Sequence, residues 1–168
     1  TSVSIPDGVS SIGNYSFFFF FGLADAEGFV IIKDILFDYY GTDEMVVIPE
    51  GVRRIGNSAF GGSGMLREVC IPSCVTEIGN EAFRDCSNLQ EVKTRSSQMQ
   101  IGDYAFYNCP SLMRMCIPWE ATIGLNAVPA SVLIVRPVSV VVKGSERQYI
   151  YDGSGKRFSV ELIPNRSQ

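Results

Sequence analysis

The chain repeats itself at a constant step, and this repeat constrains its fold more than any other feature. Three segments show it: "MLREVCIPSCVTEIGNEAFRDC" (65–86), "NLQEVKTRSSQMQIGDYAFYNC" (88–109) and "SLMRMCIPWEATIGLNAV" (111–128). The residues that recur in step are Leu66, Leu89 and Leu112; Val69, Val92 and Met115; Ile55, Ile78 and Ile101; Gly56, Gly79 and Gly102; and Phe60, Phe83 and Phe106. The pair Ile123-Gly124 arrives one position early, and residues 3–17 match residues 46–60, close to two steps downstream. Such a period indicates a stack of similar structural units.

One part of each repeat has the pattern of a short strand. The spacing Leu-x-x-Val-x-Ile is the strand signature of leucine-rich repeats, whose period of about 20–29 residues includes the step seen here. Because strand side chains alternate, we expect Val69 and Ile71 to point inward and Glu68 and Cys70 to point outward. Pro72 lacks a donor N–H and ends the strand. A single coil cannot bury its apolar side alone, so the coils must stack into a solenoid.

The rest of each repeat returns the chain to the next strand. Gly79 permits a tight corner or a close approach of two backbones. The pair Ala82-Phe83 is expected on a short helical turn, with Phe83 filling the back of the coil. The sequence therefore predicts a leucine-rich-repeat solenoid with short parallel strands on one face and short helical turns on the other.

The residues of the repeats follow a more specific pattern than the general leucine-rich-repeat signature. The stretches "VVIPEGVRRIGNSAF" and "VCIPSCVTEIGNEAFRDCSNLQEV" closely resemble the BspA-like leucine-rich-repeat family of bacterial surface proteins. The resemblance covers about residues 3–17 and 45–128, and it implies a right-handed β/α superhelix. The chain departs from the family pattern at Thr94-Arg95, at Val128, and in the usual Asn/Cys position, which holds Gly8, Gly51, Cys74 and Ser97.

We expect one structural domain with two parts: an array over residues 1–136 and a C-terminal capping segment over residues 137–168 that packs on the array. The array includes a longer, hairpin-bearing coil at about 18–45, where residues 28–46 read as strand, tight turn at Lys33-Asp34, and strand. The capping segment resembles those that close such arrays. Ser145-x-x-Gln148 predicts a helix over 145–152, followed by a strand near 157–162. The alternative is a hairpin of residues 149–151 against 158–161.

Five consecutive phenylalanines, residues 17–21, fit the repeat only in part. Phe17 and Phe20 fall in core positions of the repeat. Phe18, Phe19 and Phe21 fall in surface positions, so they form a candidate exposed apolar patch. Either the longer coil at 28–42 folds over them, or they meet a partner or an upstream coil.

Composition excludes several functions. The 14 basic and 18 acidic residues give a net charge of −4 and no basic run, so nucleic-acid binding is not expected. No apolar stretch reaches the length of a transmembrane segment. Histidine is absent, which removes the commonest general base and zinc ligand. We therefore expect no enzyme activity, no cofactor and no metal, with a thiol enzyme as the remaining catalytic hypothesis.

The five cysteines are the most reactive side chains in the sequence. Cys86 and Cys109 hold equivalent positions in adjacent coils, about 4.8 Å apart, which favours buried free thiols but leaves a disulfide open. Cys70 and Cys116 lie two coils apart, at about 10 Å, too far for a bond. Cys70-x-x-x-Cys74 lacks a second ligand pair, so it does not predict zinc.

With no catalytic or metal site expected, the remaining candidate functional site is a binding surface. Outward positions of the predicted strands form a candidate partner-binding face: Met45, Val47, Glu68, Cys70, Glu91, Lys93, Arg114 and Cys116. Solenoids bind through such faces, although the same residues could form a solvated sheet surface. The family resemblance implies a non-catalytic module, at the cell surface or secreted, that mediates adhesion or binds a host or bacterial protein, or a glycan. The alternative is a structural spacer that presents another domain of a larger surface protein.

Overall fold

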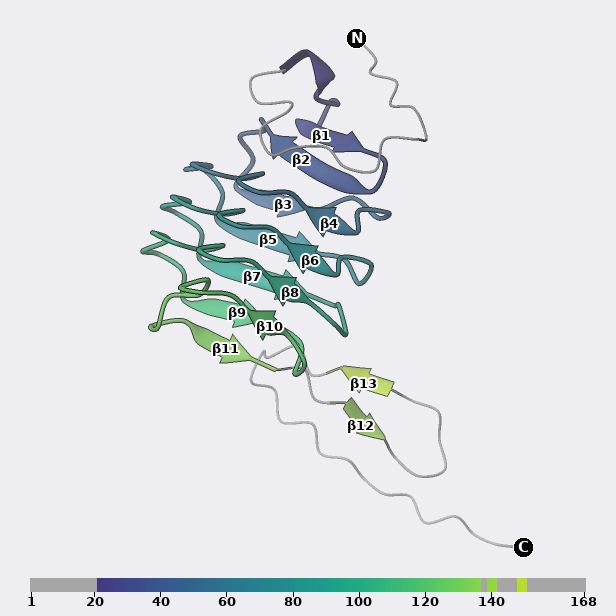
Figure 1. The fold of residues 1–168 in the computed structure, drawn as a ribbon, viewed down its shortest axis with the longest axis vertical. Helices are drawn as coiled ribbons and strands as arrows, with labels where there is room; N and C mark the ends of the chain where they lie inside the picture. Colours follow the sequence, from purple (N-terminus) through teal and green to yellow (C-terminus); the bar gives the residue numbers. More distant parts are fainter. Residues whose placement is uncertain (1–20, 137–138, 142–147, 151–168) are drawn as a thin grey trace, which may run out of the picture.

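The computed structural model describes residues 21–136, 139–141 and 148–150 (Figure 1). Within them the chain forms a β-solenoid whose coils stack along the long axis of the molecule. The elements are η1 (Phe21–Leu23), β1 (Phe29–Ile32), β2 (Ile35–Tyr39), β3 (Met45–Val47), β4 (Arg54–Ile55), β5 (Glu68–Ile71), β6 (Glu77–Ile78), β7 (Glu91–Thr94), β8 (Gln100–Ile101), β9 (Arg114–Cys116), β10 (Thr122–Ile123), β11 (Leu133–Val135), β12 (Ser139–Val141) and β13 (Gln148–Ile150).

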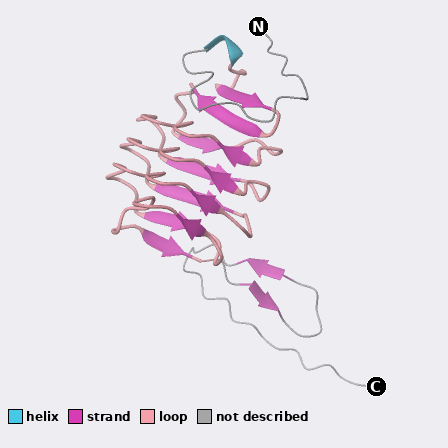
Figure 2. Ribbon diagram, viewed as in Figure 1, coloured by secondary structure: helices cyan, strands magenta, loops and turns pink. Residues whose placement is uncertain are grey.

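The solenoid has two sheets rather than one. The expected strands form a five-stranded parallel sheet in the order β11-β9-β7-β5-β3. The Ile-Gly segments, which sequence reasoning placed at corners, form a second sheet in the order β1-β2-β4-β6-β8-β10, parallel except at β1. Figure 2 shows the two rows of strands side by side down the stack. Each coil therefore makes a separate backbone ladder with its neighbour on two of its sides.

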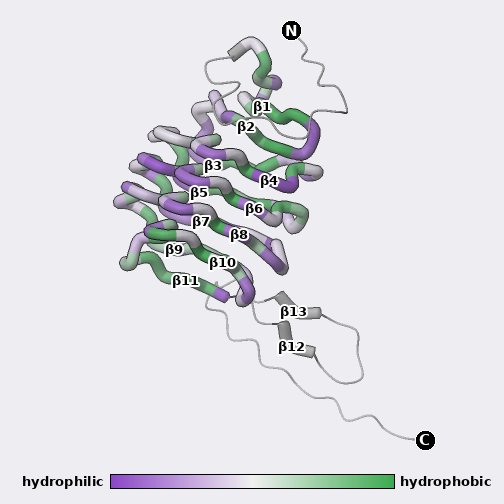
Figure 3. Tube along the Cα trace, viewed as in Figure 1, coloured by the Kyte–Doolittle hydropathy of each residue, from purple (hydrophilic) through white to green (hydrophobic). Residues whose placement is uncertain are grey.

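Alternation within the strands places the core between the sheets. In β5, Val69 and Ile71 are buried while Glu68 and Cys70 remain partly exposed, as the sequence predicts. Figure 3 shows apolar and polar positions alternating along the stacked coils. Thr94 is buried where an isoleucine is usual, and its Oγ1 accepts a hydrogen bond from the Ser96 amide at 3.0 Å. The polar departure at Thr94 is thus satisfied locally.

An aromatic file runs through the core. The rings of Phe60 and Phe83 stack with centroids 4.8 Å apart, and those of Phe83 and Phe106 at 5.0 Å, all three fully buried. These separations match the spacing of neighbouring strands, so the predicted column of phenylalanines is confirmed. Tyr39 and Phe29 extend the same file, with Tyr39 4.9 Å from Phe60.

The structure shows turns around Ala82-Phe83, and the short helical turns expected there are not seen. Among the described residues the one helix is the 3-10 turn η1, and the third side of each coil consists of non-helical turns. Backbone bonds between coils hold these turns in place: the amide of Phe83 donates to the carbonyl of Ala105 at 2.7 Å. Bonds directed to the next coil compete with those that a helix would make within its own segment. Ser58, Glu81 and Tyr104 accordingly adopt positive φ angles of 57°, 57° and 55°, which interrupt a right-handed helix.

The hairpin expected in residues 28–46 is present. Strands β1 and β2 pair antiparallel with a register shift between Val30 and Ile31, and Lys33 takes a positive φ of 59° at the turn. Strand β2 then pairs in parallel with β4, so the hairpin continues the second sheet.

The expectations for the C-terminal segment need correction. Residues 148–150 form β13, antiparallel to β12, rather than part of a helix over 145–152. The partner strand of the alternative hairpin, residues 158–161, lies outside the described residues, so the pairing of residues 149–151 with it stays a prediction. The strand expected near 157–162 lies outside the described residues.

Candidate binding surfaces

The eight residues predicted to face outward lie on one side of the five-stranded sheet. Strand register places Met45 beside Glu68, Glu68 beside Glu91, and Glu91 beside Arg114. A second column holds Val47, Cys70 and Lys93 in register. We call this surface the five-stranded face; its residues are the eight predicted ones together with Leu133 and Val135 of β11, which pair with Arg114 and Cys116.

Leu133 and Val135 were not assigned to this face from the sequence, because they do not follow the period of the repeat. Leu133 follows Arg114 by less than a full repeat, because the last coil is shorter than the others. The pattern Leu133-Ile134-Val135 after a turn at Pro129 was the available signal, since a β-branched run bounded by proline is typical of a strand.

The charges in the middle of this face pair with one another. Lys93 Nζ donates to Oε1 of Glu68 at 2.6 Å and lies 3.5 Å from Glu91 Oε2. Arg114 donates to Oε1 of Glu91 through Nε at 2.7 Å and also through Nη2. The hydrogen bond from Lys93 holds the pKa of Glu68 below its usual value, and its counterpart raises the pKa of Lys93. The network keeps both groups charged.

The ends of the face are apolar. Met45 and Val47 on β3 are 62% and 64% exposed, and Leu133 on β11 is 62% exposed. Between these ends lies a shallow depression of about 580 Å³, lined in part by Glu68, Glu91, Met113 and Leu133. The face therefore has a charged middle and apolar ends.

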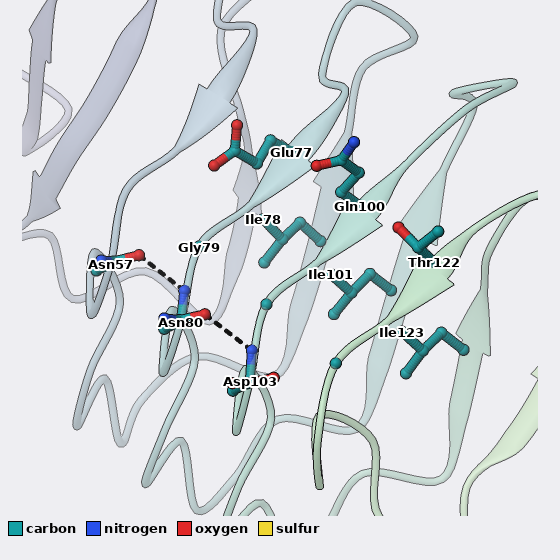
Figure 4. Close-up of a pocket in the computed structure, with 12 residues that line it drawn as sticks. Asn57, Glu77, Ile78, Gly79, Asn80, Gln100, Ile101, Asp103, Thr122 and Ile123 are labelled. Carbon is teal, nitrogen blue, oxygen red and sulfur yellow. Dashed lines mark hydrogen bonds between the residues drawn. The ribbon is translucent and has the colours of Figure 1, made fainter.

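The second sheet carries a different surface, shown in Figure 4. A depression of about 460 Å³ lies beside a ladder formed by Asn57, Asn80 and Asp103. The side-chain oxygen of Asn57 accepts the amide of Asn80 at 2.8 Å, that of Asn80 accepts the amide of Asp103 at 2.9 Å, and that of Asp103 accepts the amide of Leu125 at 2.7 Å. These oxygens are engaged in holding the coils together, so the ladder is primarily structural.

The glycines of the Ile-Gly pairs are explained by this ladder. A Cβ atom on Gly79 would lie 2.4 Å from Asn57 Oδ1 and 2.7 Å from its backbone nitrogen. Gly102 meets Asn80 in the same way, at 2.4 Å and 2.7 Å. Of the two roles considered for Gly79, the structure shows a close approach of backbones.

The cysteines form no disulfide among the described residues. The thiols of Cys86 and Cys109 are buried, and each donates to a carbonyl of the preceding coil, that of Phe60 at 3.1 Å and that of Phe83 at 3.0 Å. The neighbouring Cys109 thiol and burial together raise the pKa of Cys86. On the five-stranded face, burial and the hydrogen bond to Glu68 raise the pKa of Cys70. In Cys86 and Cys70 the raised pKa lowers the fraction of thiolate, which is the opposite of what a nucleophile needs. The pKa of Cys109 is lowered by its interaction with the Cys86 thiol, but Cys109 is buried.

No group of three or more His, Cys, Asp or Glu side chains that could hold a metal occurs in the described residues. Nor does any helix there have the length and apolarity to cross a membrane. Of the candidate apolar patch, Phe18 and Phe19 lie outside the described residues, while the backbone of Phe21 begins η1.

Solved structures share this architecture. A leucine-rich-repeat protein of T. pallidum is 28% identical, over 61% of this chain and 56% of that one, with a TM-score of 0.51. A leucine-rich cell surface protein of Faecalibacterium prausnitzii A2-165 is 31% identical, over 58% of this chain and 30% of that one, also at 0.51. A leucine-rich-repeat protein of Bacteroides capillosus shares the fold at 23% identity and 0.54, over 66% of this chain and 99% of that one.

The chain spans about half of the T. pallidum protein and about a third of the F. prausnitzii protein. None of the curated proteins compared with it matches significantly. A family model described as a BspA type leucine rich repeat region matches residues 30–129 in six copies. The chain therefore belongs to the BspA-type leucine-rich-repeat family, whose solved relatives include bacterial cell-surface proteins.

Proposed function

We propose that this protein is a non-catalytic recognition module, displayed at a cell surface or secreted, that mediates adhesion or another protein–protein interaction. Its partner is a host or bacterial protein, with a glycan as the second class of ligand. Binding takes place on the five-stranded face. The proposal of a surface location draws on the relative from F. prausnitzii, which is described as a cell surface protein.

The observation that carries the proposal is the arrangement of side chains on this face. Its central charges are held by partners from neighbouring coils, as with Lys93 and Glu68 at 2.6 Å. Long side chains that are already ordered lose less entropy when a partner binds. The exposed apolar groups at the ends, Met45 and Leu133, supply area that becomes favourable once it is covered. The face is thus partly preorganised for a protein surface.

Binding by immobilised protein to an array of matrix proteins and glycans tests the proposal. The informative variant is Lys93→Glu, which places a third acid beside Glu68 and Glu91. The matched control is Arg54→Glu, which disrupts a similar pair with Glu77, 3.0 Å apart, on the second sheet. We expect Lys93→Glu to weaken binding by about tenfold or more and Arg54→Glu to leave it within about twofold.

Two outcomes would contradict this assignment. Equal loss in both variants would move the binding site away from the five-stranded face. Absence of any ligand at concentrations of about 10 μM would argue against a recognition role of ordinary affinity.

A specific observation favours a second function, that of a spacer presenting another domain. Coils are joined on all three sides, by two strand ladders and by turn bonds such as that from Phe60 to Ala82 at 2.7 Å. Such a stack is stiff along its axis. The two functions differ in their dependence on side chains: a spacer tolerates Lys93→Glu without loss, but loses function when whole coils are deleted.

A further inference from the structure

The five-stranded face has nearly the same order of side-chain types when its strands are read in either direction. The first outward column runs apolar, acidic, acidic, basic, apolar, with the residues Met45, Glu68, Glu91, Arg114 and Leu133. The second outward column runs apolar, thiol, basic, thiol, apolar, with the residues Val47, Cys70, Lys93, Cys116 and Val135. A surface with this order can be complementary to a second copy of itself related by a two-fold axis.

The two-fold axis that uses this order runs along β7, in the plane between two facing sheets. It keeps the direction of the strands and reverses the order of the coils. Met45 then faces Leu133 of the second copy, and Val47 faces Val135 of the second copy. Met45, Val47 and Leu133 are each more than half exposed in the single chain. The contact therefore removes apolar surface from water at both ends of the face.

The same axis places opposite charges against each other. Glu68 faces Arg114 of the second copy, and by symmetry Arg114 faces Glu68 of the second copy. Both side chains are already ordered within their own chain, since Glu68 accepts from Lys93 at 2.6 Å and Arg114 donates to Glu91 at 2.7 Å. Both also remain partly exposed. Complementary charges across an interface fix the register and orientation of the two partners.

Residues on the axis itself, Glu91 and Lys93 of β7, face their own copies. Their charges are compensated within each chain. Glu91 pairs with Arg114 and also with Lys93, whose Nζ lies 3.5 Å from Oε2, and Lys93 pairs in turn with Glu68. The predicted face carries two acids, Glu68 and Glu91, and two bases, Lys93 and Arg114, so its formal charges cancel. Two copies of the face therefore do not repel each other as a whole.

We propose that the partner of the five-stranded face is a second copy of this same chain, docked face to face about the axis along β7. The inference rests on the proposed function, because it names the partner of the same surface. The coil order reverses across the axis, so the two chains run in opposite directions, as a contact between two opposing surfaces requires.

The affinity of this contact is limited by its size. Five short strands offer less area than the roughly 800 Å² that each side of a standard interface contributes. We therefore expect a weak dimer, with a dissociation constant of about 10–100 μM. Many copies on each of two opposing surfaces strengthen the contact through multivalency.

Exchange of charges across the interface tests the proposal, measured by sedimentation of the full chain. Arg114→Glu places acids opposite each other and Glu68→Arg places bases opposite each other, so we expect each variant to self-associate about tenfold more weakly or less. In an equimolar mixture of the two variants, every facing pair again joins an acid and a base. Association should then return to within about threefold of the unmodified chain. Arg54→Glu, on the second sheet, is the control and should change association by less than about twofold.

Rescue by mixing separates a facing charge pair from a loss of folding, because two unfolded variants do not restore each other. The proposal is overturned if the unmodified chain remains a monomer up to about 500 μM, well above the expected dissociation constant. It is also overturned if the mixture associates no better than its components, or if Arg54→Glu weakens association as much as Arg114→Glu does.

Failure of this inference can be distinguished from failure of the proposed function. A monomeric chain that still binds a matrix protein through Lys93 overturns the second copy as the partner and leaves the recognition role of the face intact. Self-association that follows the charge exchange, with no binding to any other protein or glycan, supports the second copy and excludes a host partner.

Discussion

The regular coils and the hairpin coil build the same core by different means. In the regular coils, residues one full repeat apart fill equivalent positions, as Phe60, Phe83 and Phe106 do in the aromatic file. In the hairpin, Tyr39 occupies the next place in the file although it lies nearer to Phe60 in the sequence than a full repeat. Leu36 likewise lies beside Ile55 in the second sheet and is fully buried.

The difference shows that stacking requires a side chain of suitable size at a position in space, and not a residue at a position in the period. The fit is nevertheless looser at the hairpin. The rings of Tyr39 and Phe60 are tilted by 34°, whereas those of Phe83 and Phe106 deviate from parallel by 4°. A Cβ on Gly56 would meet one backbone oxygen, that of Leu36, at 2.9 Å, while Gly79 has three atoms nearer than that.

The largest effect should come from removing a ring in the middle of the file. Phe83→Ala leaves a cavity bounded by two rings, and we expect it to lower the free energy of unfolding by about 3–5 kcal/mol. Tyr39→Ala should cost at least about half as much, since Tyr39 also lies between two rings. Urea unfolding measures both. A negligible cost for Tyr39→Ala would mean that the hairpin is not an integral part of the core.

A smaller effect should separate the glycines of the two regions. Gly79→Ala forces backbone and side-chain atoms of the preceding coil apart, and we expect a loss of about 2–3 kcal/mol, the upper part of the range for overpacking. Gly56→Ala should cost about 1 kcal/mol, because the hairpin offers a single close atom. Gly64→Ala is the control: its nearest neighbour, Ser87 Oγ, lies at 3.7 Å, an ordinary contact. If Gly56→Ala lowers the melting temperature more than Gly79→Ala does, the looser fit at the hairpin is contradicted.

Within residues 21–136, the ladder of Asn57, Asn80 and Asp103 joins regular coils and leaves out the hairpin, and breaking it should give a still smaller effect. Asn80→Ala leaves the amide of Asp103 without its side-chain acceptor, so we expect a loss of about 1 kcal/mol. Asn80→Asp keeps an acceptor oxygen and should restore most of the stability. Chemical denaturation of the two variants provides the comparison. If both behave alike, the hydrogen bond is not what the side chain contributes.

The smallest effect distinguishes the tyrosine of the hairpin from the phenylalanines of the regular coils. Burial raises the pKa of Tyr39 above its usual value of 10.0. The folded state thus favours the neutral phenol. The stabilisation that results is lost at a pH high enough to ionise the phenol in the folded state as well. A raised folded pKa gives stability that is fully present below the unfolded pKa and is lost as pH rises through the folded one. Melting temperature measured between about pH 9 and 11 should therefore follow a different course for the unmodified chain than for Tyr39→Phe. Parallel curves would show that Tyr39 ionises equally in both states.

Much of the candidate site could be predicted from the sequence, because alternation along a strand assigns each side chain to one face. Glu68 and Cys70 point outward for this reason, and Lys93 follows from the period. Leu133 could not be placed in the same way, since the shorter last coil breaks the period. The pairing of Lys93 with Glu68 also depends on the geometry between strands. The candidate patch at Phe18, Phe19 and Phe21 stays a prediction.

The sequence by itself determined that the chain stacks, which residues form the core columns, and which strand side chains face outward. These properties follow from period and alternation, both of which can be read along the chain. Only the tertiary structure decided that the Ile-Gly segments form a second sheet, that the third side consists of turns, and that Tyr39 continues the file of Phe60. The physical reason is that the backbone groups of one coil form hydrogen bonds with residues about one repeat away. The sequence of a single coil therefore does not reveal which of its segments will pair with the next coil.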